Sequence, residues 1–502
     1  MMRGADPKKS APLFFVCIIA CDIKKCSYQE AFGADPRSAP FLLRRPAAAG
    51  DVHIRVWEGP TEKDSKMYQE KSGSLFIKYA LPQMVGLLLN SVYLIVDGMF
   101  IGNRLGREAM AAAAVSVPAV EILIALSLAI SVGASIIISS SFGAGDRKRA
   151  NDAFNLSLVI AAVASLLIAV LGNVFMDGLA AMLGATPDIH DEAISYLWYI
   201  VTGSPFLIFS FAFSSYARAD NRPKLAMWAL AVGSVSNIIL DYVFLYPLDM
   251  GIGGAALATA LGPVFSVIIM LPHFLRGRGM LRFALPPFSG RLAWGILYLG
   301  APAFIMEFSI GIVTLFYNIA INANDFGELG LAAYLTIGYI ALIILTVFLG
   351  IGQGMQPLIS YFHGRGEHGR NRELMAFLFK TVAVLGLLLY GAVLFLSKGF
   401  IGVFTPDDAE LISFTHDKAS IYFAGFVFAG VTIQIVTFFQ SIQKAVPAFV
   451  LALLRSTVFV LLFLVGLPLA WGREAIWPAL SAAELATFLV GVWWYRRTVS
   501  RG

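Results

Sequence analysis

The sequence carries little charge and almost no cysteine. Only 14% of its 502 residues are Asp, Glu, Lys or Arg, while 58% are hydrophobic. A soluble domain of this length needs more charge to cover its surface, so a soluble fold is excluded. All three cysteines lie at or before Cys26. The chain beyond that residue therefore has no disulfide, thiol nucleophile or thiolate metal site.

Motifs for chemical catalysis are also missing. No metal-ligand spacing, nucleotide-binding loop or nucleophile–base set is visible, so we expect no enzyme, no ATP-driven transport and no cofactor. The formal net charge of +5 comes from basic residues in short segments between apolar blocks. That distribution favours contact with anionic membrane lipids and not with nucleic acid.

Apolar blocks of about 20 residues fill most of the chain, and each is long enough to cross a bilayer as a helix. We count twelve blocks, at 75–101, 111–141, 154–174, 193–214, 225–246, 253–273, 292–319, 330–360, 374–396, 412–438, 446–469 and 475–495. The fold class is therefore an all-α membrane protein. We divide it into an extension (1–66), a first six-helix bundle (67–273), a linker (274–291) and a second bundle (292–502).

Residues 1–66 differ from the rest because they mix charge, proline and one short apolar run, Ala11–Cys21. We interpret them as a disordered extension or a misassigned start, with Met67 as the natural beginning. A signal peptide, or a lipid attached to Cys21, is the alternative.

The loops alternate in charge and so predict an orientation. Basic loops contain Arg147–Arg149, Arg218–Lys224, Arg276–Arg291, Arg365–Arg372 and Lys444; the loops between them contain Asp188–Glu192, Asp325–Glu328 and Asp407–Glu410. By the positive-inside rule, both ends of the helical body face the cytoplasm, and we expect a multi-pass protein of the inner membrane.

The two halves share a sequence pattern. Gly133-Ala134-Ser135 lies near the end of the second block and Gly143-Ala144-Gly145-Asp146 follows it. Gly354-Met355-Gln356 and Gly364-Arg365-Gly366-Glu367 stand in the same way at the end of the eighth block, always 221 positions later. Six helices repeated in one orientation predict a pseudo-twofold axis along the membrane normal, with substrate handled between the halves.

Several segments resemble the multidrug and toxic compound extrusion (MATE) family. They are Leu81-Pro82 with Val96–Gly102, Phe142–Gly145, Asn237–Asp241, Gly251–Thr259 and Gly352–Ser360. The resemblance covers about residues 70–500. It implies two six-helix bundles around a V-shaped cleft, and export of organic, often cationic, compounds in exchange for H⁺ or Na⁺. The expected partners are small-molecule substrates and membrane lipids, and we expect a monomer.

Buried acids are the candidates for ion coupling, because a charge deep in a membrane helix costs about 2.5–3.5 kcal/mol and usually has a function. Asp97 matches the family's acidic first-helix position. Asn237 and Asp241 are four residues apart on one helix face, where their oxygens could bind Na⁺ or the amide could tune the acid for protonation. Thr259 could add a hydroxyl. A helix-end capping pair is the structural alternative for Asn237 and Asp241.

Two polar stripes are candidates for the substrate cleft. Gln83, Asn90, Tyr93 and Asp97 share one face of the first helix. Glu307 and Asn318 lie on the seventh helix, with Glu307 about one and a half turns after Pro302, which we expect near the start of that helix. A carboxylate there could attract a cation or carry a proton; pairing with Lys380 or Arg455 is the structural alternative. We expect Arg455 to be structural, and Glu121 and Glu484 could lie near membrane ends.

Two other functions remain open. A lipid-linked oligosaccharide flippase of a related type would need cationic groups along its cleft to bind a pyrophosphate, whereas the deep charges of the first half are acidic. A membrane-embedded enzyme would need a clustered catalytic set, and none is visible.

Overall fold

The computed structural model describes residues 70–286, 288–404 and 408–500, and within them the chain is helical, with no β-strand. The predicted extension (1–66) lies outside the described residues. The first half contains α4 (Ser72–Leu75), α5 (Leu81–Leu105), α6 (Arg107–Gly143), α7 (Arg147–Val174), α8 (Met176–Leu183), α9 (His190–Ala219), α10 (Pro223–Leu245) and α11 (Gly251–Leu275). The second half contains α12 (Gly290–Ala323), α13 (Gly327–Gly364), α14 (His368–Phe404), α15 (Ala409–Tyr422), α16 (Phe426–Ser441), α17 (Ala445–Leu453), α18 (Phe459–Trp471) and α19 (Ala479–Val499).

The predicted all-α membrane fold is confirmed, and a helical run lies at each of the twelve predicted positions. Eleven helical runs are long and apolar enough to cross a bilayer; the tenth combines α15 with α16, and the eleventh combines α17 with α18. The twelfth run is α19, which is 21 residues long and includes Glu484 and Arg496. Most runs extend about a turn beyond the apolar blocks, because a helix continues into the polar boundary of the bilayer. The short α8 was not predicted.

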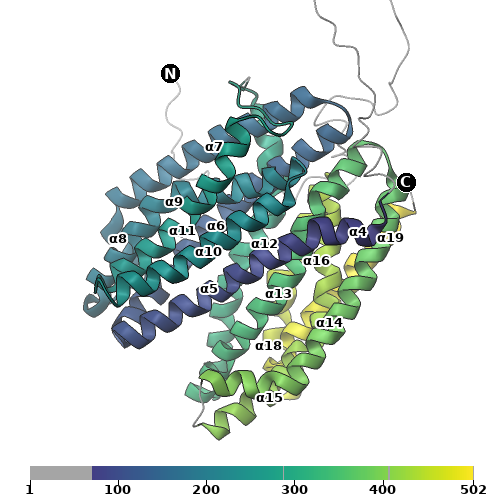
Figure 1. Cartoon of the computed structure of the whole chain (residues 1–502). Helices are drawn as coiled ribbons and strands as arrows, with labels where there is room; N and C mark the ends of the chain where they lie inside the picture. Colours follow the sequence, from purple (N-terminus) through teal and green to yellow (C-terminus); the bar gives the residue numbers. More distant parts are fainter. Residues whose placement is uncertain (1–69, 287, 405–407, 501–502) are drawn as a thin grey trace, which may run out of the picture. The chain divides into compact units, whose positions relative to one another are not determined.

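The helices form two groups, coloured purple to teal and green to yellow in Figure 1. Aromatic packing stabilises the core of the first group. Phe274 of α11 stacks on Phe154 of α7 at 5.5 Å and on Phe213 of α9 at 5.1 Å between ring centroids. Buried aromatic rings of this kind fix the spacing of neighbouring helices through specific packing. In a membrane this matters because apolar helix surfaces interact with lipid about as well as with each other.

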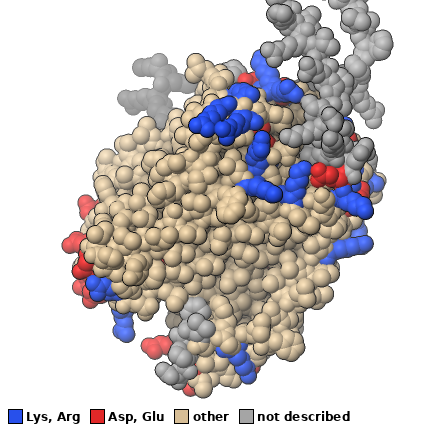
Figure 2. Space-filling view, in the orientation of Figure 1, with Lys and Arg blue, Asp and Glu red and all other residues tan. Residues whose placement is uncertain are grey.

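Charged side chains mark the two ends of the helical body. Figure 2 shows a broad uncharged belt, with lysines and arginines gathered mainly at one end. We call this the basic end; it contains the loops 144–146 and 365–367. The opposite, acidic end contains Asp188, Asp191 and Asp325.

The repeated glycines lie where the two halves touch at the basic end. A Cβ on Gly143 would lie 2.0 Å from the carbonyl oxygen of Tyr361, and one on Gly364 would lie 1.9 Å from that of Ser140. These contacts are reciprocal, because each partner is also 221 positions from its counterpart. Gly145 and Gly366, in the adjoining turns, have φ of 78° and 79°, a left-handed conformation that favours glycine. The glycines repeated in the two halves are therefore needed at equivalent places, where each half touches the backbone of the other.

The segment that connects the halves is fixed to the first half. On α7, the side-chain oxygen of Asn151 accepts a hydrogen bond from the backbone N–H of Arg282 at 2.7 Å, and that of Asn155 accepts one from Ala284 at 2.9 Å. The Asn155 amide also donates to the Arg282 carbonyl at 2.8 Å. These bonds satisfy backbone groups that a free loop would leave to water.

A buried carboxylate holds the start of the same segment. Asp220, after α9, accepts a hydrogen bond from the Met280 N–H at 2.7 Å and contacts Nε2 of His273 at 2.8 Å. The side chain of Leu281 is fully buried beside them. Residues 280–284 are therefore a fixed part of the first half.

Candidate functional site

Asp97 of α5 and Asp241 of α10 meet in the interior of the first half. Their side chains are 8% and 0% exposed, and the two carboxyls lie close enough to interact electrostatically. Both Asp241 oxygens and Oδ1 of Asp97 receive no hydrogen bond from an N–H or hydroxyl group in the described part of the chain. The structure thus brings together the two acids that the sequence singled out.

Asn237 and Thr259 lie beside this pair. The Asn237 amide donates to Oγ1 of Thr259 at 3.4 Å, and its own Oδ1 is buried without a donor. Asp241 is fully buried and accepts no backbone N–H, so the two residues do not form a helix cap. We call Asp97, Asn237, Asp241 and Thr259 the acid cluster.

Two tyrosines face the acid cluster. Tyr93, one turn before Asp97, lies close enough to both carboxyls to interact with them electrostatically. Tyr196 of α9 does the same, and its hydroxyl also lies close to Thr259. Sequence reasoning missed Tyr196, because one tyrosine among many in an apolar helix gives no periodic signal.

Gln83 lies nearer the basic end, in contact with both halves. Its amide donates to Oε1 of Gln353 on α13 at 3.1 Å, and its oxygen accepts from the Arg218 guanidinium at 2.9 Å. Arg218 also donates to Ser214 at 2.8 Å and Ser215 at 2.9 Å. Gln83 is therefore a bridging residue between the halves, and it is separate from the acid cluster.

Glu307 borders a small cavity of about 40 Å³ between the two halves. By this measure one water needs about 10–15 Å³, so the cavity holds a few waters. Its lining comes from α6, α12, α13 and α16 and comprises Leu128, Val132, Ala303, Met306, Glu307, Leu349, Gln353, Gln356, Thr437 and Gln440. The site is polar on one side, where an acid and three amides converge.

The other stripe residues are not gathered in this cavity. Asn90 and Asn318 are half-buried, and neither lines it. Thr314 lies seven residues after Glu307 and four before Asn318 on α12; it is exposed, and its hydroxyl donates a hydrogen bond to the carbonyl of Ile310 at 3.0 Å. Seven- and four-residue spacing on one helix thus placed residues on a common face, but not at a common depth.

Of three acids in the helices, Glu307 and Glu121 occupy other positions than predicted. Glu307 is in the middle of α12, because the helix begins at Gly290, well before Pro302. Glu484 lies five residues after the start of α19; it is 2% exposed and forms a two-bond ion pair with Arg455, at 2.7 and 3.1 Å. Glu121 lies inside α6, fourteen residues from its start, and has a buried, unpartnered Oε2. Hydropathy alone did not distinguish these depths.

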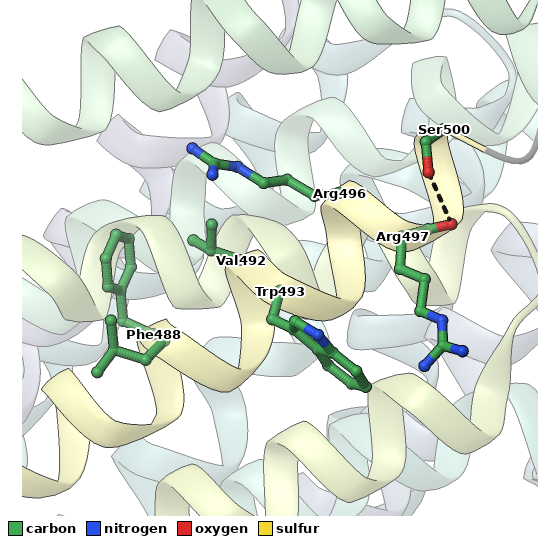
Figure 3. A pocket seen from close by; sticks show the side chains of 7 residues that line it. Phe488, Val492, Trp493, Arg496, Arg497 and Ser500 are labelled. Carbon is green, nitrogen blue, oxygen red and sulfur yellow. Dashed lines mark hydrogen bonds between the residues drawn. The ribbon is translucent and has the colours of Figure 1, made fainter.

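An open groove of about 530 Å³ follows the last three turns of α19 (Figure 3). Phe488, Val492 and Trp493 form its apolar side, and the guanidinium of Arg497 lies 5.3 Å from the Trp493 ring. Arginine beside tryptophan is typical of a helix end at the membrane–water boundary. The groove shares no residue with the acid cluster or the cavity.

The MatE family model matches residues 82–243 and 302–465, one segment in each half. The chain belongs to the MatE family. It is a multi-pass membrane transporter of this multidrug-efflux family and not an enzyme.

Known MatE proteins resemble the chain over nearly its whole helical body. Multidrug export protein MepA of Staphylococcus aureus (strain MRSA252) is 25% identical over 436 residues, which cover 84% of this chain and 94% of MepA. A crystal structure of MATE in complex with MaL6 superimposes with a TM-score of 0.83 at 22% identity, covering 88% of this chain and 99% of that one. A MOP superfamily transporter from Pyrococcus furiosus, described as having a reversed polarity of its binding pocket that suggests a different function, gives 0.81 at 22% identity, covering 88% and 98%.

Proposed function

We propose that the protein is a secondary active exporter of organic cations, coupled to H⁺ or Na⁺ through the acid cluster. The observation that carries this proposal is the pair Asp97–Asp241. Two buried carboxyls that pair with no basic residue in the described part of the chain cannot both be charged without a large desolvation cost, so the pair favours binding of a cation. A proton would serve, because a protonated carboxyl is neutral and can donate a hydrogen bond to the other carboxylate.

Sodium is the alternative coupling ion. Oδ1 of Asp97, Oδ1 of Asn237 and the Asp241 oxygens are buried and lack donors. Carboxylate and amide oxygens are the ligand types that hard cations prefer. The same cluster therefore suits either ion, and both remain in the proposal.

The negative charge of the cavity lining supports a cationic substrate. The similar Pyrococcus transporter is described by the reversed polarity of its pocket, so polarity is a property on which function in this fold can depend. Here the charged residue that lines the cavity is Glu307. A flippase for a pyrophosphate-linked lipid would need basic groups in that place. The multidrug export function of MepA supports the same conclusion.

We place the basic end in the cytoplasm and the protein in the inner membrane, as a monomer whose partners are substrate and lipids. In the proposed cycle the halves separate alternately at each end. The ion enters the acid cluster from outside and the substrate leaves; the substrate from inside then replaces the ion. One net charge moved inward at 100 mV supplies about 2.3 kcal/mol, roughly a fiftyfold gradient.

Transport by the purified protein in liposomes tests the proposal. A fluorescent organic cation, ethidium, is offered with an imposed pH gradient, an imposed Na⁺ gradient, or neither. We expect one of the two gradients to drive ethidium against its own gradient. Ethidium transport that is unaffected by either gradient, or that requires ATP, would overturn the proposal.

A further inference from the structure

Two glycine contacts fix how α6 and α12 are aligned. A Cβ on Gly133 would lie 1.9 Å from the Ile296 carbonyl oxygen, and one on Gly300 would lie 1.8 Å from that of Ala129. Residue numbers rise along α6 from Ala129 to Gly133, whereas those of their partners on α12 fall from Gly300 to Ile296. The two helices are therefore antiparallel, and their backbones are in contact. This alignment places Glu307, seven residues after Gly300, level with residues 121–122 of α6.

The side chain of Glu121 belongs to the face of α6 that meets α12. Leu128 and Val132, seven and eleven residues further along, line the cavity together with Glu307. These spacings define one helix face. Glu121 and Glu307 lie close enough to interact electrostatically, and Oε2 of Glu121 is buried without a donor. Each half of the protein therefore contributes one carboxyl to the same level.

Neutral polar groups complete the surroundings. Gln356 and Thr437 line the cavity at 5% and 8% exposure, and neither side chain has a hydrogen-bond partner in the described residues. Within those residues, no lysine or arginine forms an ion pair with Glu121 or Glu307, and the buried Arg455 is already paired with Glu484. Amide and hydroxyl oxygens can solvate a cation, whereas the two carboxyls supply its counter-charge.

We propose that Glu121 and Glu307 form a two-carboxylate recognition site across the halves, which selects dicationic over monocationic organic substrates. This inference rests on the proposed function as a cation exporter and names its substrate class. A monocation leaves one buried carboxylate uncompensated, and that costs free energy in a medium of low dielectric. A dication compensates both, so its second charge contributes binding that a single acid would not provide.

Binding of matched probes tests the site. The full-length purified protein is titrated with hexyltrimethylammonium, and with alkane bis(trimethylammonium) dications containing two to six methylenes, by isothermal titration calorimetry. We expect the best dication to bind at least tenfold more tightly than the monocation. Equal affinities in the unaltered protein would mean that the pair retains a proton, and would overturn the proposal.

Variants separate this site from general effects. Glu121→Gln should reduce the dication preference to about onefold while the monocation binds at least as well as before. Glu121→Asp keeps the charge and should keep a preference of several fold, which guards against a folding defect in the first variant. Glu108→Gln, an exposed acid on the same helix, should leave the preference unchanged. An unaltered preference in Glu121→Gln, or its equal loss in Glu108→Gln, would contradict the assignment.

Transport distinguishes a failure of this inference from a failure of the proposed function. Glu121→Gln in liposomes should still export hexyltrimethylammonium under the coupling gradient, because the acid cluster is intact. If the unaltered protein exports neither probe but binds dications preferentially, the export proposal fails and the recognition site stands. If it exports both probes without preference, only the recognition site fails.

Discussion

The two halves of the transporter share one backbone plan but neutralise their buried charges in opposite ways. In the first half, Asp97 and Asp241 lie close together in the interior, and neither forms an ion pair with a basic residue in the described part of the chain. In the second half, Arg455 and Glu484 form a complete ion pair. An acid without a counter-charge gains from binding a cation, whereas a paired acid does not. We infer that one copy of the duplicated bundle has kept a structural charge and the other a charge that can exchange.

Removal of the two acids of the first half should have the largest effect on transport. Asp97→Asn and Asp241→Asn should each abolish gradient-driven export while the protein still inserts, because asparagine cannot carry a proton and offers no charge to Na⁺. The position equivalent to Asp97 in the second half provides the control: Asn318→Ala should alter affinity or substrate range but keep coupling. Efflux from liposomes against an imposed gradient measures both. Full coupled export by the double Asp variant would move the ion site elsewhere.

Substitutions in the ion pair of the second half should lower the stability of the protein and leave ion coupling unchanged. Glu484→Gln leaves Arg455 buried without its partner and should lower stability by about 3–5 kcal/mol. Replacing both residues together by leucine should cost much less, since no charge is then left unpaired. Thermal unfolding in detergent reports the order of the variants, and gradient-driven transport by the double variant tests coupling. A Glu484→Gln protein that is fully stable but uncoupled would place the exchangeable charge in the second half.

The reciprocal glycine contacts test how far the two halves are equivalent. Gly143→Ala and Gly364→Ala each place a methyl group against a backbone carbonyl and should force the basic ends apart, at a cost of about 1–3 kcal/mol each. Gly98→Ala, where no atom lies within 4 Å, is the matched control and should be neutral or slightly stabilising. Labelling of cysteines introduced at the basic end would report the opening. If only one of the two alanine variants opened the basic end, the two glycine contacts would not be equivalent in their effect on the structure.

Glu307 is an exception to the contrast between the halves, because it is an acid of the second half that forms no ion pair with a basic residue at any described position. Glu307→Gln should weaken export of a cationic compound several fold, with little change for a neutral one, since a carboxylate attracts only positive charge. Paired transport assays with one compound of each kind measure this. Equal losses for both compounds would indicate a structural role for the residue.

Local patterns in the sequence predicted the helices and the repeat, because hydropathy and loop charge are properties of short segments. They also singled out Asp97, Asn237, Asp241 and Thr259, which the structure brings together. They did not reveal the partners that other helices supply, such as Tyr196 for Thr259 or Glu121 for Glu307. The depth of one helix against another is set by contacts such as Gly133 with Ile296, and a single helix does not encode that alignment in its own periodicity.

The docked connection between the halves limits their travel. Ala284 is held on α7 by Asn155, and α12 begins at Gly290, so only six peptide links span the two anchored points. A fully extended chain covers at most about 3.6 Å per residue, so the first turn of α12 stays within roughly 22 Å of that anchor in every state. The connection thus acts as a short tether at the basic end. It permits a rocking of the halves about their contact and prevents their wide separation there.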